Sequence, residues 1–450
     1  MNEALRVAVV GSGPAGFYAA DALLRSEEPR VCVDVLDRLP TPWGLVRLGV
    51  APDHENIKAV SRAFEKTAAR PGFRFFGNVE VGSTVTHDEL ARLYDAVVYT
   101  VGAQTDRRLG IPGEDLPGSW PATAFVAWYN GHPDFQDLEF DLSCERVVVV
   151  GNGNVAIDCA RMLALTAEEL APTDTTDAAV EAIVTAAVEE IVMLGRRGPV
   201  QAAFTPPELK ELGELAGAEP VVDPADLVLD PASEAELEAD RERARRNYEL
   251  LQEYAARAPE GKPRRIVLRF LASPLAILGE ERVEAVEVVR NELVEEDGRL
   301  VARPTGETEL IPCGLVLRSV GYKGVALPGV PFDERAGTIP NDRGRVQGAE
   351  RTYVAGWIKR GPSGVIGTNK KDAAETVELL LEDARAGRLE APERGDLGAL
   401  LDGKGAEWVA YDGWQAIDAA ERGAGEPLGR PRVKLARWEE LLRAGRGVPR

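Results

Sequence analysis

The chain has 450 residues, of which 44% are hydrophobic and 28% charged, and its formal net charge is −21. This length predicts two or three domains, and the acidic balance argues against binding to nucleic acid or to anionic membranes. No apolar run reaches the length of a membrane span, and a predicted strand begins by Arg6, which leaves no room for a targeting segment. We therefore expect a soluble, cytoplasmic protein without integral membrane association.

The first predicted strand, Arg6 to Val10, leads into the loop Gly11-Ser12-Gly13-Pro14-Ala15-Gly16 and then into a predicted helix, Phe17 to Arg25. In this context the first glycine permits a tight turn, and the second lets the backbone approach a pyrophosphate. The third lets helix and strand pack closely. The next strand, Val31 to Leu36, ends at Asp37, whose carboxylate suits an adenosine ribose. The pattern predicts a dinucleotide-binding fold.

A second strand-loop-helix unit begins at Arg146 to Val150, followed by Gly151-Asn152-Gly153-Asn154-Val155-Ala156. A later strand, Glu190 to Leu194, ends in Gly195-Arg196-Arg197 instead of an acidic residue. Two guanidinium groups suit a ribose 2′-phosphate, which a carboxylate would repel. We favour NADP(H) over NAD(H) on this placement, with a solvated surface pair as the alternative interpretation.

Two similar apolar strands, Ala96 to Ala103 and Leu315 to Tyr322, are the expected crossing points between domains. We predict an α/β protein with two Rossmann-like dinucleotide-binding domains, one (residues 104–321) inserted into the other (1–103 and 322–450). Strands near Arg265 to Phe270 and Val283 to Arg290 should complete the sheet of the inserted domain. The charged stretch Glu234 to Arg257 predicts a helix with a solvated face.

After the second crossing, Tyr353 to Trp357 predicts a strand, followed by a glycine-rich segment and a helix from about Lys371 to Arg385. A helix start at this point would bring backbone N–H groups near a bound flavin. The alternative is a glycine-rich turn with a packing tryptophan.

The four cysteines, Cys32, Cys144, Cys159 and Cys313, include no C-x-x-C pair. An enzyme of the thioredoxin-reductase type needs two nearby thiols, and iron–sulfur clusters need clustered thiolates. We therefore predict no dithiol centre, no intrinsic iron–sulfur cluster and no metal site.

Four long stretches resemble adrenodoxin-reductase-like ferredoxin–NADP⁺ reductases, and the similarity runs through nearly the whole chain. They are Thr41-Pro42-Trp43-Gly44-Leu45-Val46-Arg47, Gly49-Val50-Ala51-Pro52-Asp53-His54, Gly195-Arg196-Arg197-Gly198-Pro199 and Gly356-Trp357-Ile358-Lys359-Arg360-Gly361-Pro362. The resemblance implies a bound FAD, NADP(H) as the two-electron partner and a small iron–sulfur ferredoxin as the one-electron partner.

The resemblance also implies site residues. Around FAD it places Ala15, Asp37, Leu45, Val81, Trp357 and Gly364, Val365 and Ile366, where Asp37 stands in place of the glutamate expected in the family. Around NADP(H) it places Arg107, Asn152, Gly153, Asn154, Val155, Arg196, Arg197, Glu208 and Gly364. His54 and Glu211 resemble the polar catalytic pair of the family near the nicotinamide and flavin rings. A capping role for His54 and a place in the first turns of a helix for Glu211 are the structural alternatives.

Two other functions share the paired loops: a flavoprotein small subunit like that of glutamate synthase, and a noncatalytic NADP(H)- and FAD-binding redox sensor. The first normally carries an N-terminal cysteine-rich region, which this chain does not have. Candidate contacts for an acidic ferredoxin are Arg241, Arg243, Arg245, Arg246, Lys262, Arg264 and Arg265, although helix arginines among glutamates more often form solvated pairs.

Overall fold

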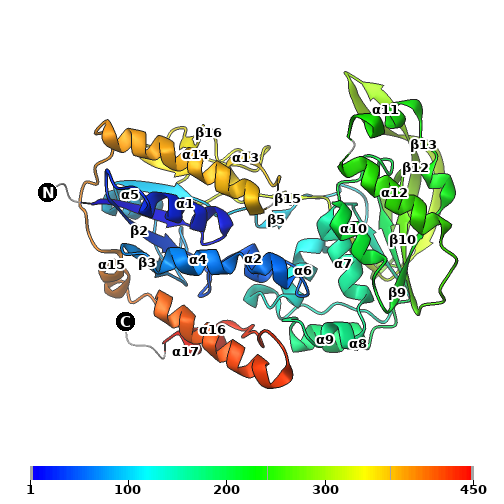
Figure 1. Cartoon of the computed structure of the whole chain (residues 1–450), viewed down its shortest axis with the longest axis horizontal. Helices are drawn as coiled ribbons and strands as arrows, with labels where there is room; N and C mark the ends of the chain where they lie inside the picture. Colours follow the sequence, from blue (N-terminus) through cyan, green and yellow to red (C-terminus); the bar gives the residue numbers. More distant parts are fainter. Residues whose placement is uncertain (1–3, 241, 365, 447–450) are drawn as a thin grey trace. The chain divides into compact units, whose positions relative to one another are not determined.

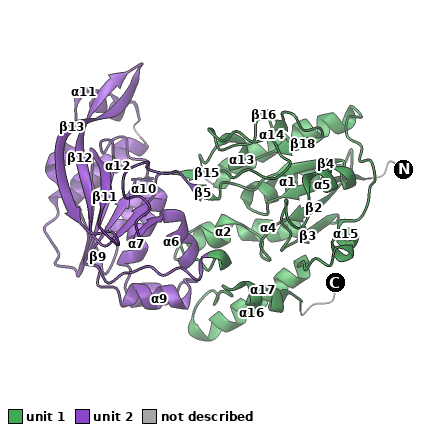
Figure 2. Cartoon of the chain, turned by 180° about the vertical axis from the view of Figure 1, so that it is seen from behind, with its two compact units in different colours: residues 1–105, 130–134, 321–450 green, residues 106–129, 135–320 purple. Residues whose placement is uncertain are grey.

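The structure, a computed structural model, describes residues 4–240, 242–364 and 366–446. The chain divides into two compact units (Figure 2): unit 1 comprises residues 1–105, 130–134 and 321–450, and unit 2 comprises residues 106–129 and 135–320. The expected boundaries fall within two residues of these divisions, but the short segment 130–134 groups with unit 1 and was not foreseen.

Unit 1, of which Figure 1 labels the strands β2, β3 and β16, is built on a seven-stranded sheet with the order β16-β17-β18-β4-β1-β2-β3. Its parallel strands are β1 (Leu5–Val10), β2 (Val31–Leu36), β3 (Phe73–Phe76), β4 (Ala96–Tyr99) and β18 (Thr352–Val354), and the short strands β16 (Asn341–Asp342) and β17 (Arg345–Val346) add an antiparallel edge. Alternate residues of β1 enter two separate apolar clusters, Val7 and Val9 in one and Ala8 and Val10 in the other. A near-continuous apolar strand is what burial on both faces requires.

The late strand β18 pairs in parallel with β4, with Tyr353 beside Val98. Unit 1 is therefore completed by residues that follow unit 2 in the chain. The helices and remaining short strands of unit 1 are α1 (Pro14–Leu24), α2 (Leu45–Leu48), α3 (Glu55–Lys58), α4 (Ser61–Ala68), α5 (His87–Leu93), α13 (Trp357–Arg360), α14 (Ile366–Arg385), α15 (Leu397–Gly403), α16 (Tyr411–Gly425), α17 (Trp438–Arg446) and β15 (Tyr322–Lys323), with a 3₁₀ helix at Glu426–Leu428. A second 3₁₀ helix, Pro133–Phe135, and the strand β5 (Thr105–Asp106) lie at unit boundaries.

Unit 2 has a six-stranded sheet with the order β6-β14-β7-β8-β10-β9. These strands are β6 (Ser119–Pro121), β7 (Arg146–Val150), β8 (Glu190–Leu194), β9 (Ala218–Val222), β10 (Arg264–Arg269) and β14 (Leu315–Arg318). Its helices are α6 (Ala122–Tyr129), α7 (Asn154–Ala164), α8 (Ala167–Leu170), α9 (Asp177–Val184), α10 (Pro206–Leu212), α11 (Pro231–Ala239) and α12 (Arg243–Ala256), with a 3₁₀ helix at Pro224–Leu227.

The expectation that Val283 to Arg290 joins this sheet is wrong. Most of this segment lies in β12 (Ala285–Glu296), which starts two residues later than expected and forms a separate antiparallel sheet with β11 (Ala272–Leu278) and β13 (Arg299–Pro312). Buried residues of this small sheet, including Val286 and Val288, pack in one apolar cluster with Val148 and Val150 of β7. The small sheet thus covers one face of the main sheet of unit 2, and helices cover the other.

Two helical expectations also need correction. The stretch Glu234 to Arg257 is two helices, α11 and α12, and the Asp240 carboxylate between them accepts a 3.0 Å hydrogen bond from the N–H of Arg243. The residue Trp357 begins α13 instead of ending a strand, and α14 begins at Ile366, earlier than expected. Among the described residues, no helix is both long and apolar enough to cross a membrane.

Candidate functional site

The three glycines of the first loop differ in the space around them. A Cβ atom on Gly11 would lie 2.7 Å from the carbonyl carbon of Thr100, and one on Gly16 would lie 2.0 Å from the oxygen of Gly11. A Cβ atom on Gly13 would meet no protein atom within 4 Å. The fold therefore requires glycine at the first and third positions, whereas the second faces open space of the kind that a pyrophosphate needs.

The helix α1 begins directly at this open space. Its N-cap is Gly13, which has no side chain to satisfy the N–H groups of the first turn, and Pro14 occupies the first helical position. Such a helix start binds an anion through its free N–H groups and its dipole. The loop and helix therefore fit a dinucleotide phosphate.

Asp37, at the end of β2, is hydrogen-bonded to the glycine loop itself. Its Oδ2 accepts hydrogen bonds from the Ser12 N–H (2.9 Å) and hydroxyl (2.5 Å), and its Oδ1 accepts one from the Leu39 N–H. Burial raises the pKa of Asp37, and the hydrogen bonds from Ser12 and Leu39 oppose that shift. The sequence did not predict that Asp37 holds the glycine loop through Ser12. The predicted contact of Asp37 with a ribose stays a prediction.

A second segment, residues 41–49, packs against the glycine loop through backbone contacts. The Trp43 N–H donates to the Ser12 carbonyl at 2.9 Å, and a Cβ atom on Gly44 would lie 3.0 Å from Cα of Gly13. Leu45 follows at the start of α2 and is 38% exposed, which is high for a large apolar residue. Nε1 of Trp43 is buried and has no hydrogen-bond partner among the described residues. An uncovered leucine and an unpartnered buried donor beside an open loop fit a site that a large ligand would fill.

The late glycine segment returns to the same helix start. Gly356 has φ +81°, and a Cβ atom there would lie 2.6 Å from Cβ of Ala15. The next residue, Trp357, packs on Tyr322 with ring centroids 5.3 Å apart, and its buried Nε1 has no partner within the described chain. The structure thus places Ala15 beside the segment that contains Trp357.

The remaining residues predicted near FAD give mixed results. Gly364 has φ +80° and Ile366 begins α14, whereas Val365 lies outside the described residues. Val81 is only 5% exposed and packs in an apolar cluster, so its predicted cofactor contact stays a prediction.

The second glycine loop, in unit 2, repeats the geometry of the first. A Cβ atom on Gly151 would lie 2.2 Å from the oxygen of Ser319, but one on Gly153 would meet nothing within 4 Å. Gly153 is the N-cap of α7 and offers no side chain to the first turn. This loop also has open space at its second glycine and fits a second dinucleotide.

The two asparagines of this loop hold a neighbouring segment. The Asn152 carbonyl accepts hydrogen bonds from the N–H groups of Ala203 and Phe204, and Oδ1 of Asn154 accepts one of 2.8 Å from the Thr205 N–H. Thr205 is the N-cap of α10, the helix that carries Glu208 and Glu211. The loop asparagines therefore position this helix, while Val155 packs partly into the core.

The arginine pair after β8 has a fixed backbone and uncommitted side chains. The Asn291 side chain donates to the carbonyl of Arg196 at 2.8 Å, and the Leu271 N–H donates to that of Arg197 at 3.0 Å. Arg196 is exposed and Arg197 half-buried, and within the described residues neither guanidinium forms an ion pair with a carboxylate. Two such cations on a rigid turn suit a phosphate dianion.

The predicted catalytic pair is divided between the units. His54, in unit 1, is the N-cap residue of α3, but its side chain makes no capping hydrogen bond. This observation argues against a capping role for the His54 side chain. Glu211, in unit 2, has its Oε2 3.5 Å from Nε of Arg161, a buried arginine that also binds Asp158. The predicted joint role of His54 and Glu211 stays a prediction.

Arg107 is exposed and begins a loop that a buried carboxylate organises. The carboxylate of Glu114 accepts hydrogen bonds from the N–H groups of Leu109 (2.7 Å) and Gly110 (2.8 Å), and it lies 3.5 Å from Nη1 of Arg318. These contacts define the loop that carries Arg107 and were not evident from the sequence.

Most candidate ferredoxin contacts have structural partners. The guanidinium of Arg264 donates to the carbonyls of Val188, Leu165 and Ile183, which leaves it little capacity for a partner protein. Arg243, Lys262 and Arg265 pair with Asp240, Glu260 and Glu190. Arg245 and Arg246 are exposed, and Arg241 lies outside the described residues.

Known proteins resemble this chain over nearly its whole length. The family model for pyridine nucleotide-disulphide oxidoreductases matches residues 5–195. The NADPH-ferredoxin reductase FprA of Mycobacterium leprae is 52% identical, with 98% of both chains covered. The human mitochondrial NADPH:adrenodoxin oxidoreductase is 44% identical, with 97% of this chain and 91% of the human protein covered. The solved structure of Mycobacterium tuberculosis FprA in complex with NADPH is 51% identical with a TM-score of 0.94, covering 98% of this chain and all of that one.

Proposed function

Since the chain belongs to the family of adrenodoxin-reductase-like ferredoxin–NADP⁺ reductases, we propose that it transfers electrons between NADP(H) and a ferredoxin through a bound FAD. The ferredoxin in this proposal is a small iron–sulfur protein, and the reaction takes place in the cytoplasm. The proposal also assigns FAD to residues 1–103 and 322–450, and NADP(H) to residues 104–321.

The observation that supports it most directly is the pair of glycine loops with unequal surroundings. Both loops leave open space at the second glycine and at a helix start. The first is enclosed by backbone contacts from Trp43 and Gly44 and by the approach of Gly356, as expected for a resident cofactor. The second is followed by the uncommitted guanidinium groups of Arg196 and Arg197, as expected for an exchangeable phosphorylated nucleotide.

Bound FAD supplies a group that exchanges hydride with nicotinamide and single electrons with an iron–sulfur centre. The residues of the chain bind and orient the nucleotides. The N–H groups at the starts of α1 and α7 bind the two pyrophosphates, and Arg196 and Arg197 bind the 2′-phosphate. Leu45 and Trp357 would line the FAD site, Arg107 and Glu208 would line the NADP(H) site, and His54 and Glu211 would orient the nicotinamide.

Two measurements test the proposal. In anaerobic stopped-flow absorbance, NADPH should bleach the visible band of the bound flavin, and NADH should do so far less efficiently. In steady-state assays, cytochrome c reduction by NADPH should depend on added ferredoxin. A protein that binds both nucleotides but shows neither bleaching nor turnover would be the noncatalytic redox sensor instead.

A further inference from the structure

A buried ion pair joins residues 41–49 to the C-terminal part of unit 1. The Arg47 guanidinium donates two hydrogen bonds to the Glu421 carboxylate, Nη1 to Oε2 at 2.8 Å and Nη2 to Oε1 at 2.5 Å. The side chains of Arg47 and Glu421 are 3% and 0% exposed, respectively. Glu421 lies on α16, far along the chain from Arg47.

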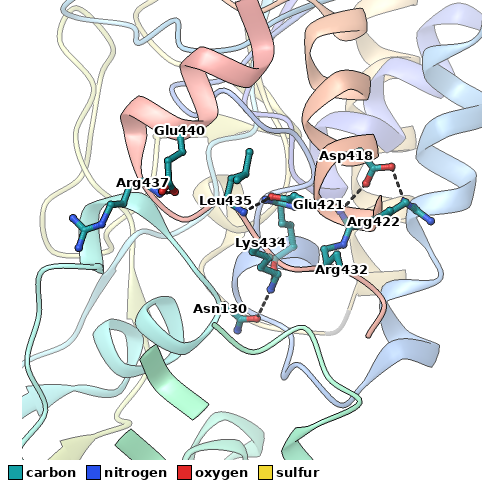
Figure 3. A network of polar contacts seen from close by, with 10 residues as sticks. Asn130, Asp418, Glu421, Arg422, Arg432, Lys434, Leu435, Arg437 and Glu440 are labelled. Carbon is teal, nitrogen blue, oxygen red and sulfur yellow. Dashed lines mark hydrogen bonds and ion pairs between the residues drawn. The ribbon is translucent and has the colours of Figure 1, made fainter. Parts of the chain in front are cut away.

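Glu421 is also the centre of a larger network (Figure 3). Nη1 of Arg432 lies 3.0 Å from Oε2 of Glu421 and 2.6 Å from Oδ1 of Asp418, and the Leu435 N–H donates to Oε1 of Glu421 at 2.9 Å. The charge and hydrogen bonds of Arg47 and Arg432 outweigh the effect of burial and lower the pKa of Glu421. This carboxylate therefore closes the segment 429–435 onto α16.

The same C-terminal segment holds the backbone of Arg47. Nζ of Lys434 is buried and donates to the Arg47 carbonyl at 3.2 Å. It also donates to Oδ1 of Asn130 at 3.1 Å (Figure 3). The Arg47 guanidinium lies over the ring of Trp414, with 5.2 Å from Cζ to the centroid, and Trp414 meets Trp43 edge to face at 4.9 Å. Residues 43–47 are thus held through a side chain, a carbonyl and an aromatic ring.

These contacts continue to the first glycine loop. Trp43 donates its N–H to Ser12, and Gly44 lies so close to Gly13 that a Cβ atom would be 3.0 Å from its Cα. Leu45, the exposed residue predicted to contact FAD, is only two residues before Arg47. A continuous series of contacts therefore joins Glu421 to the loop through Arg47, Trp414 and Trp43.

A buried ion pair is costly to desolvate and is weak support for stability alone, but it fixes one arrangement of the groups it joins. We propose that Glu421 is a positioning residue for FAD: by holding Arg47, it fixes residues 43–47 against the glycine loop, so that residues 411–435 act on the FAD site through residues 43–47. This inference rests on the proposed FAD site in the first loop.

The test compares the purified holoenzyme with its Glu421→Gln variant, which keeps the shape of the side chain but leaves Arg47 without its charge partner. We expect FAD release to be roughly tenfold faster or more, a change of about 1.4 kcal/mol, and the visible absorption spectrum of the bound flavin to change. The matched control is Arg446→Gln on α17, which removes an ion pair with Glu407 whose two side chains are 44% and 56% exposed and lie outside the Glu421 network. It should leave release rate and spectrum unchanged.

If Glu421→Gln does not fold, Lys434→Met decides the question, because it removes the hydrogen bond to the Arg47 carbonyl and keeps most of the aliphatic side chain. Faster FAD release in Lys434→Met supports the inference. An unchanged release rate and flavin spectrum in the folded variant, even with a lower melting temperature, would overturn it. A wild-type protein that binds no FAD would instead refute the proposed function, whatever the variants do.

Discussion

Gly13 and Gly16 stand three residues apart in one loop, yet only Gly16 is needed for packing. A methyl group on Gly16 would collide with the oxygen of Gly11, whereas one on Gly13 would enter space that no protein atom occupies. Gly13 also has φ −73°, which alanine adopts without strain. Glycine is therefore required at position 16 by the packing of the fold, whereas at position 13 it leaves space for the ligand.

We expect Gly13→Ala to leave the free energy of unfolding of the FAD-free protein within about 0.5 kcal/mol of wild type but to weaken FAD binding at least about tenfold, or about 1.4 kcal/mol. Gly16→Ala should destabilise the FAD-free protein by about 1–3 kcal/mol because of overpacking. Urea unfolding and FAD titration measure the two effects. Equal destabilisation by both changes would contradict the assignment of open space at Gly13.

The matching change in the second loop is Gly153→Ala, because Gly153 has the same open surroundings. This variant should retain its FAD and lose affinity for NADP⁺, measured by titration of the flavin absorbance. Loss of FAD in Gly153→Ala would contradict the assignment of the two loops.

Arg196 and Arg197 should determine the choice between NADPH and NADH. Each charge-assisted hydrogen bond contributes about 1.5–3 kcal/mol, so replacing both residues by glutamine should raise KM for NADPH at least about tenfold and leave KM for NADH nearly unchanged. The control is Arg265→Gln, which lies at the start of the neighbouring strand and pairs with Glu190. Equal losses for both coenzymes would refute the 2′-phosphate contact.

At the scale of elements, the sequence predicted the strands around both glycine loops well. The strands expected at Val31 to Leu36, Arg146 to Val150 and Glu190 to Leu194 have the same bounds in the structure. These parallel strands are mostly apolar, with one charged residue in each, so their pattern is strong. The sequence predicted a strand at Val283 to Arg290 but assigned it to the wrong sheet. An antiparallel strand with one solvated face can pair with many neighbours, so its pattern does not identify its partner.

The sequence pattern did not predict which distant residues contact one another. The motif that contains Arg47 was recognised in the sequence, but nothing in it indicates that Arg47 forms a buried ion pair with Glu421, far along the chain. Asp37 was correctly placed at the end of its strand, yet its bonds to Ser12 depend on the fold of the loop. Tertiary geometry decides which of several chemically suitable partners a carboxylate meets.

Asp383, near the end of α14, connects the antiparallel edge of the sheet of unit 1 to that helix. It is buried and accepts hydrogen bonds from Arg345 on β17, from Tyr353 on β18 and from Arg388. Burial opposes its ionisation, but these bonds prevail and lower the pKa of Asp383 to about 2.

Because the folded pKa of Asp383 lies below the ordinary value, its stabilisation is full above pH 4 or so and is lost as the pH falls toward about 2. We expect Asp383→Asn to lower the free energy of unfolding by roughly 2 kcal/mol at pH 7. The difference from wild type should shrink below about pH 4, as measured by urea unfolding across pH 3–7. A difference that does not depend on pH would show that the charge of Asp383 does not contribute.

At the scale of the whole molecule, the described residues form four buried apolar clusters, and each cluster belongs to a single unit, two to each. Each unit therefore has a core of its own and one glycine loop. A ligand stabilises the folded part that binds it, by about 2.7 kcal/mol at a concentration 100 times its Kd.

Differential scanning calorimetry should accordingly show two ligand-sensitive transitions. We expect NADP⁺ to raise the melting temperature of one, and removal of FAD to lower that of the other. Gly153→Ala should abolish the NADP⁺ shift without changing the FAD-sensitive transition. A single transition that responds to both nucleotides would show that the two cores unfold together.

The order of the strands in unit 1 has a consequence for synthesis on the ribosome. Strand β4 is made before all of unit 2, but its partner β18 follows unit 2, and Glu421, which holds Arg47, is made later still. At roughly 5–20 residues per second, β4 emerges on the order of ten seconds or more before its neighbour. The inserted unit can therefore fold first, and the nascent chain should acquire its flavin only near the end of translation.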